Sequence, residues 1–285
     1  MATLISVGQV LDQSLEHCRK HYKELLAITL WMVVASIPSI IGKLLAPTGG
    51  DPALTAGDWL SFSFSMVGVL LATIISIWAY AALVLTVAEQ ASGKKLNLKN
   101  IYRQSWKLFL PYVLLTICLT AIIIGIALLA APGIALLMIG SGTNAPAALT
   151  AIGTPLLLIG AALALGLIAK YSIELAFAPF ILLLGKQGVV ASIKGSIALV
   201  KGRWWATCLR FVVPKLVYSL IVFVVSFVSF KALEILIALV SSSSGIGTLV
   251  IYTFSLLLSV FFSVIATPLI IATDYYLYDS LRKTR

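Results

Sequence analysis

Residues 98–109 read Leu98-Lys-Asn-Ile-Tyr-Arg-Gln-Ser-Trp-Lys-Leu-Phe109, and the pattern of this stretch returns twice in the chain. Its serine, Ser105, has counterparts at Ser14 and Ser196, each 91 positions away. Around each serine the same columns fall at i, i+4, i+7, i+8 and i+11, which is one face of an α-helix. The apolar columns are Val7, Leu98 and Val189; Leu11, Tyr102 and Ile193; Leu15, Trp106 and Ile197; and Cys18, Phe109 and Val200. Several columns that match at one fixed offset predict an internal repeat of three units.

The second of these stretches is amphipathic. Leu98, Ile101, Tyr102 and Ser105 share one face, and the other face carries Lys99, Asn100, Arg103, Gln104 and Lys107. A helix with one apolar and one basic face is typical of the membrane interface. Two arrangements stay open for the apolar face: contact with lipid, or packing on other helices of the same protein. The candidate contacts for anionic lipid are Lys94, Lys95, Lys99, Arg103, Lys107, Lys194, Lys201 and Arg203.

Composition indicates a membrane protein. Of the 285 residues, 61% are hydrophobic and 11% are charged, with a mean hydropathy of +1.09, whereas soluble domains are roughly 25% charged. Six apolar stretches exceed the ~20 residues that cross a bilayer as a helix. They cover residues 25–47, 62–88, 110–138, 152–184, 208–240 and 247–272. None shows the alternation of a barrel strand, so we predict an all-α integral membrane protein with six transmembrane helices.

Two crossings in each unit give every unit the same orientation. We therefore expect three parallel two-helix repeats, each preceded by a cytoplasmic amphipathic helix. The repeats cover about residues 5–92, 96–185 and 187–285, within a single membrane domain of residues 1–285.

The net charge is +10, and most of the 20 Lys and Arg residues fall before, between or after the hairpins, on one side. The positive-inside rule then places both termini in the cytoplasm. These charges are spread along one membrane face, which favours anionic lipid over nucleic acid as the partner.

Groups that could support catalysis are sparse. His17 and His21 lie one helical turn apart, but no carboxylate or thiol is placed with them as in a metalloprotease motif. We expect a pair that is solvated or lies at the level of the lipid headgroups, without a metal. Cys18, Cys118 and Cys208 imply no disulfide framework. No phosphate-binding glycine loop or nucleophile motif is found. We expect no enzymatic activity and no cofactor.

Charged residues inside apolar stretches are the remaining candidates for a site. Lys170 and Glu174 are four apart, and Lys231 and Glu234 are three apart, so each pair shares a helix face. A buried strap between helices is favoured over a transport site for Lys170 and Glu174. Arg210 and Lys215 are expected to reach towards the cytoplasm. Glu89 and Asp274 are expected to be solvated at helix ends.

The C-terminal run from Pro268 to Arg282 resembles a signature of prokaryotic six-helix proteins, the glycerophosphoryl diester phosphodiesterase membrane-domain family. Tyr278, Asp279 and Arg282 hold the pattern with one residue inserted. The stretches Val7–Tyr22 and Ala191–Trp205 are also similar to that family. The resemblance implies a prokaryotic inner (plasma) membrane. The histidines and metal carboxylates of the family's catalytic barrel have no match here, so it implies no phosphodiesterase activity.

Mitochondrial carriers also have three two-helix units, but their signature places an acidic residue two positions after the proline of each odd helix. Here those positions hold Ile40, Ile134 and Leu216, so the carrier family is excluded.

These observations predict a non-enzymatic multi-pass membrane protein, either a lipid-contacting scaffold or a membrane subunit that binds a partner. A protein partner and a homo-oligomer both stay open. The alternative is a small-solute or lipid transporter or channel that uses Lys170 and Glu174.

Overall fold

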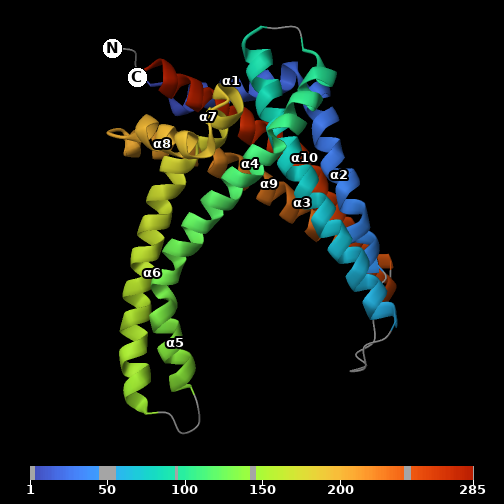
Figure 1. Ribbon diagram of the computed structural model, residues 1–285. Helices are drawn as coiled ribbons and strands as arrows, with labels where there is room; N and C mark the ends of the chain where they lie inside the picture. Colours follow the sequence, from blue (N-terminus) through green and yellow to red (C-terminus); the bar gives the residue numbers. More distant parts are fainter. Residues whose placement is uncertain (1–3, 45–55, 94–95, 142–145, 241–244, 285) are drawn as a thin grey trace. The chain divides into compact units, whose positions relative to one another are not determined.

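The computed structural model describes residues 4–44, 56–93, 96–141, 146–240 and 245–284, and within these ranges every regular element is a helix (Figure 1). Six of the described helical segments are long and apolar enough to cross a membrane. They are Tyr22–Gly42, Asp58–Ala91, Leu98–Gly140, Ala148–Gly185, Trp204–Ile235 and Val260–Lys283. This confirms the prediction of an all-helical chain with six helices able to span a bilayer.

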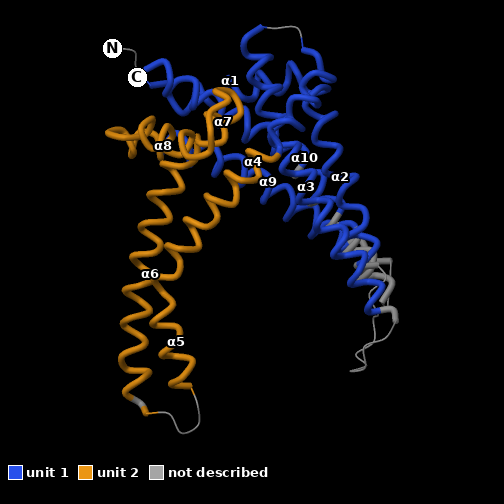
Figure 2. Tube along the Cα trace, viewed as in Figure 1, with its two compact units in different colours: residues 1–109, 209–284 blue, residues 110–208, 285 orange. Residues whose placement is uncertain are grey.

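The helices form two compact units (Figure 2). Unit 1 contains Met1–Phe109 and Leu209–Thr284, and unit 2 contains Leu110–Cys208. The boundaries run through α4 (Leu98–Ala127) and α9 (Trp204–Val240). They therefore do not coincide with the ends of the predicted repeats.

Unit 1 is built around the last turns of α3 (Ala56–Ala91). All residues from Ala81 to Val87 are buried, as expected for a helix that is apolar on every side. Helices α2 (Tyr22–Leu44) and α10 (Gly245–Lys283) pack against it, and α1 (Val7–Lys20) packs on α10 and α2.

The start of α1 is fixed by a capping box. The Gln9 backbone N–H donates to Ser6 Oγ, and the Ser6 N–H donates to Gln9 Oε1. These bonds satisfy amide groups that lack helical partners. Arg19 and Lys20 lie in the last turn, where cations favour the helix end. Only His21 separates α1 from α2.

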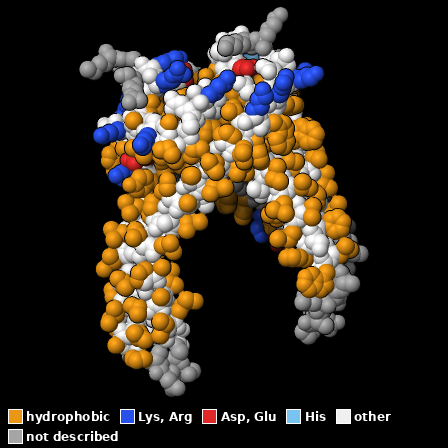
Figure 3. Space-filling model, in the orientation of Figure 1, with side chains coloured by type: hydrophobic (Ala, Val, Ile, Leu, Met, Phe, Trp, Pro, Cys, Tyr) orange, Lys and Arg blue, Asp and Glu red, His pale blue; other side chains and the backbone are white. Residues whose placement is uncertain are grey.

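Unit 2 contains a long hairpin. The chain leaves the second half of α4, and then the short helix η1 (Leu128–Ala130) and α5 (Ala131–Gly140) pack against α6 (Ala147–Leu175). Residues 110–169 include no charged side chain, and hydrophobic side chains cover the visible face of this hairpin (Figure 3). Helices α7 (Ala178–Gly185) and α8 (Val189–Val200) follow, and α8 packs on α7 and α6.

Glycines lie where the two helices of a hairpin come closest together, in the α2–α3 hairpin and in the α5–α6 hairpin. A Cβ added at Gly42 in α2 would lie 2.7 Å from the Ser65 backbone nitrogen of α3. A Cβ added at Gly133 in α5 would lie 2.3 Å from the Leu157 nitrogen of α6. Small residues at such points let membrane helices pack closely.

The second amphipathic stretch differs from the predicted separate helix. Helix α4 runs on from Leu98 to Ala127, so this stretch and the following span are one helix. In the third copy, Gly202 has a φ of +84° between α8 and α9, a conformation that favours glycine. No glycine occupies the corresponding place after Phe109, which allows α4 to continue.

Candidate functional site

The three serines that align in the predicted repeat are all fully buried, but their partners differ. Ser14 Oγ lies 3.0 Å from the Leu11 carbonyl oxygen and 2.7 Å from the Tyr218 hydroxyl. Ser105 Oγ donates to the Ile101 carbonyl at 2.8 Å. Ser196 Oγ donates to the Glu174 carbonyl and accepts from the Phe177 N–H. Ser196 thus satisfies backbone groups between α6 and α7, whereas Ser105 bonds within its own helix.

Three cations follow one exposed stripe along the start of α4. Lys99, Arg103 and Lys107 are spaced by four residues and are exposed, whereas Ile101 and Ser105 on the opposite side are fully buried. We call these three cations the basic stripe. Its side chains share a face because residues four apart are neighbours on a helix.

An aromatic slot lies beside these turns of α4. It has a volume of about 270 Å³ and is lined by Trp31, Ile75, Trp78, Tyr102 and Trp106. The ring of Trp78 stacks on Trp106 with centroids 5.9 Å apart, and it lies 5.3 Å from the Tyr102 ring. Trp78 is 6% exposed and Trp106 is 55% exposed, so the slot runs from a buried ring to an exposed one.

Trp78, one of the residues that line the slot, has a buried indole N–H without a hydrogen-bond partner within the described part of the chain. A buried N–H without a partner is unfavourable. Together, slot and stripe offer aromatic faces and three cations, a combination that suits a molecule with an apolar part and an anionic group.

The sequence pattern places Trp106 in an apolar column of the predicted repeat and does not single out Trp31 or Trp78. Their convergence depends on how α2, α3 and α4 pack, which no local pattern reports. The predicted contacts Lys194 and Lys201 are exposed near α8, and Arg203 is partly exposed. Lys94 and Lys95 lie outside the described residues.

The two predicted ion pairs are not buried. Lys170 Nζ lies 4.0 Å from Glu174 Oε1, and the Lys170 side chain is 55% exposed. The backbone oxygen of Lys170 accepts a bond from Trp204 Nε1, close to the end of α6. Lys231 and Glu234 are 2.7 Å apart and both about half exposed. The prediction of a buried strap at Lys170 was therefore wrong.

A more buried pair joins Lys215, which was expected to reach towards the cytoplasm, to Asp274, which was expected to be solvated. Lys215 Nζ of α9 lies 2.9 Å from Asp274 Oδ1 of α10, and their side chains are 26% and 10% exposed. The ammonium also lies 3.2 Å from the centroid of the Phe211 ring, a cation–π contact. The two residues are 59 positions apart in the sequence, so no local spacing indicates this pair.

His17 joins three helices and is not the solvated residue that the sequence predicted. It is 6% exposed, with Nε2 3.0 Å from Gln90 Oε1 in α3 and Nδ1 3.0 Å from the Tyr276 hydroxyl in α10. Because Oε1 only accepts, Nε2 carries the proton and donates, and Nδ1 accepts from the tyrosine. Glu16, Lys20, His21, Asp279 and Lys283 line the same open polar groove.

The stability of unit 1 should depend on pH through His17. Burial lowers the pKa of His17 below its ordinary value of 6.5, and the charges of His21 and Lys20 lower it further. A lowered folded-state pKa means that the unfolded chain binds the proton more readily. The stabilisation is therefore complete above about pH 6.5 and is lost as the pH falls through the lower, folded-state pKa. Thermal unfolding between pH 7.5 and 5 should show this loss, and His17→Gln should flatten the profile; equal slopes would contradict the assignment.

The described residues include no cluster of three or more His, Cys, Asp or Glu that could hold a metal ion. No family model, curated protein or solved structure matches this chain. The resemblance to the phosphodiesterase membrane-domain family stays a prediction.

Proposed function

We propose that this chain is a non-enzymatic multi-pass membrane protein that binds anionic phospholipid on its cytoplasmic side, with both termini in the cytoplasm. The observation that carries the proposal is the basic stripe on α4 next to the aromatic slot. A phosphate would lie against Lys99, Arg103 or Lys107, and the glycerol and upper acyl region would contact the aromatic rings.

The expected selectivity follows from the charges. Each Lys or Arg near an anionic surface contributes ~1 kcal/mol. Three such residues give ~3 kcal/mol, a preference of roughly 100-fold over a neutral lipid. Exposed Trp106 beside the stripe fits the interfacial depth at which tryptophan is enriched.

The 91-residue offset of the predicted repeat also relates two glycines at helix contacts. Gly42 and Gly133 are 91 positions apart, the same offset as the serines, and each lies at the close approach of its hairpin. This supports a repeat that relates α2–α3 to α5–α6. The third copy places Val224 in that column, and this side chain is 49% exposed, so the third hairpin lacks the glycine contact.

Transport through Lys170 and Glu174 is the weaker alternative, because their side chains are 4.0 Å apart and Lys170 is largely exposed. A coupled carrier usually holds its charged groups in the bundle interior.

The proposal predicts that phosphatidylglycerol stabilises the detergent-solubilised protein and that phosphatidylcholine with the same chains does not. Ligand at about 100 times its Kd adds ~2.7 kcal/mol to the free energy of unfolding. Thermal unfolding titrations measure this. The variant Lys99→Gln, Arg103→Gln, Lys107→Gln should lose most of the response.

A charge-matched control is Lys186→Gln, Lys194→Gln, Lys201→Gln, which removes three exposed cations from unit 2. It should keep the saturable response to phosphatidylglycerol. If both triple variants lose the response equally, the attraction is diffuse and the α4 site is rejected.

A further inference from the structure

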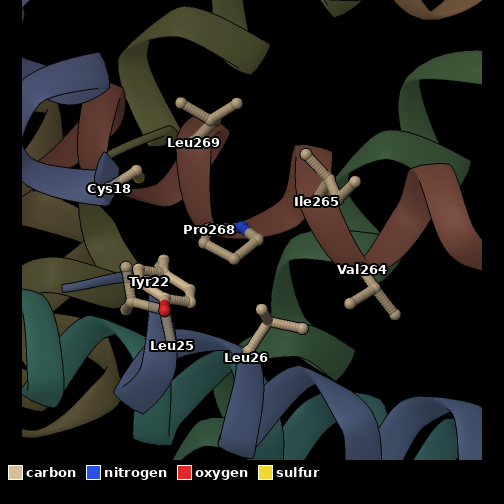
Figure 4. Close-up of a pocket in the computed structure, with 8 residues that line it drawn as sticks. All are labelled: Cys18, Tyr22, Leu25, Leu26, Val264, Ile265, Pro268 and Leu269. Atoms are coloured by element: carbon tan, nitrogen blue, oxygen red, sulfur yellow. The ribbon is translucent and has the colours of Figure 1, made fainter. Parts of the chain in front are cut away.

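A second cavity lies where α1 turns into α2. We call it the elbow cavity. It has a volume of about 170 Å³ and is lined by Cys18 of α1, by Tyr22, Leu25 and Leu26 of α2, and by Val264, Ile265, Pro268 and Leu269 of α10 (Figure 4). Apart from the Cys18 thiol and the Tyr22 hydroxyl, the lining side chains are aliphatic or proline. A cavity so lined stays dry unless an apolar group fills it.

The volume of this cavity and its place along the membrane-spanning segments favour a lipid acyl chain over a compact ligand. Drug-sized ligands occupy roughly 300–1,000 Å³, whereas an apolar cavity of about 150 Å³ accepts a group the size of benzene. The membrane-spanning part of α2 begins at Tyr22, and the α10 residues belong to the span Val260–Lys283. The cavity therefore opens where acyl chains of the bilayer begin.

A cation lies near one of the residues that line the cavity. Lys23 Nζ is 5.8 Å from the centroid of the Tyr22 ring, and Tyr22 lines the cavity and is 53% exposed. Lys20, three residues earlier, instead lines the polar groove with His17 and Tyr276. Of these two lysines, Lys23 is therefore the one that neighbours a lining residue of the elbow cavity.

We infer that the elbow cavity binds one anionic phospholipid, with a segment of an acyl chain inside it and the phosphate against Lys23. The site belongs to different helices from the basic stripe and does not depend on it. It differs from general lipid contact because it is a discrete, saturable site with a defined rim.

Cys18 offers a direct reporter of occupancy. Burial raises the pKa of its thiol to about 12, so alkylation is slow and sensitive to shielding. With Cys118→Ala and Cys208→Ala, Cys18 is the remaining cysteine of the chain. The rate of its reaction with N-ethylmaleimide is measured in delipidated detergent micelles, then with dioleoylphosphatidylglycerol or dioleoylphosphatidylcholine at equal mole fractions. At about ten times Kd the free fraction is about one tenth, so phosphatidylglycerol should slow labelling about tenfold.

Two matched pairs of variants locate the effect. Leu26→Trp fills the cavity and should abolish the response, whereas Leu30→Trp, one turn along α2 at a residue that is 49% exposed and outside the lining, should keep it. Lys23→Gln should weaken phosphatidylglycerol binding about fivefold, and Lys20→Gln should not.

Three results would overturn the inference: unchanged labelling with phosphatidylglycerol, equal protection by phosphatidylcholine, or a full response in Leu26→Trp. The same assay in the Lys99→Gln, Arg103→Gln, Lys107→Gln background separates this site from the proposed function, because protection of Cys18 should persist there even when the α4 site is lost.

Discussion

Replacing Asp274 with asparagine should destabilise the protein by about 3–5 kcal/mol, because it leaves the mostly buried Lys215 ammonium, whose side chain is 26% exposed, without its counter-charge. The carboxylate lies 2.9 Å from Lys215 Nζ, and its side chain is 10% exposed. The change conserves the size of the side chain, so a loss of stability reports the charge. Denaturant or thermal unfolding in detergent micelles measures it.

The ion pair itself need not be stabilising. Removing both charges together, as Lys215→Met with Asp274→Leu, should recover most of the loss, since an apolar pair of similar volume often equals or exceeds a buried ion pair. Glu234→Gln is the matched control at a half-exposed pair, with an expected change within about 1 kcal/mol. An Asp274→Asn variant as stable as Glu234→Gln would show that Lys215 does not depend on Asp274.

Replacing Gly133 with alanine should destabilise the hairpin of unit 2 by about 1–3 kcal/mol or more. The added Cβ would lie 2.3 Å from the Leu157 nitrogen and 2.4 Å from its Cα. These are backbone atoms, so α5 and α6 must move apart. The measurement is the unfolding midpoint in detergent.

Gly125 gives the control for this prediction, because it lies in the same arm of the hairpin and an added Cβ there would meet no heavy atom within 4 Å beyond its own stretch of helix. Gly125→Ala should be neutral or stabilising by about 0.5–1 kcal/mol, the usual effect in a helix. Equal midpoints for the two alanine variants would show that Gly133 is not at a close contact.

The helices of this protein follow from its sequence, because a run such as residues 110–169 without a charge is typical of helices that can span a membrane. In the stretch at 98–109, Ile101 and Ser105 are buried and Lys99 is exposed, whereas Trp106, from the predicted apolar columns, is 55% exposed. The local spacing of residues predicts where helices form, but it does not predict which helices contact one another.

Contacts between distant helices were not predictable in the same way. The spacing of Lys170 and Glu174 by four residues predicts an ion pair on one helix, yet the more buried pair joins Lys215 to Asp274 across two helices. The local sequence predicts a solvated His17, whereas Gln90 and Tyr276 bond to it from α3 and α10. The same limit hid the aromatic slot, which three helices build together.

Binding of anionic lipid at the start of α4 is tested most directly by tryptophan fluorescence in nanodiscs with brominated lipids. The bromines are placed either on phosphatidylglycerol in a phosphatidylcholine background or on phosphatidylcholine in a phosphatidylglycerol background. Trp106 lies beside the basic stripe and is 55% exposed. We expect stronger quenching when phosphatidylglycerol carries the bromines, with the difference lost in Lys99→Gln, Arg103→Gln, Lys107→Gln. Equal quenching by both lipids in the unmodified protein would contradict the account.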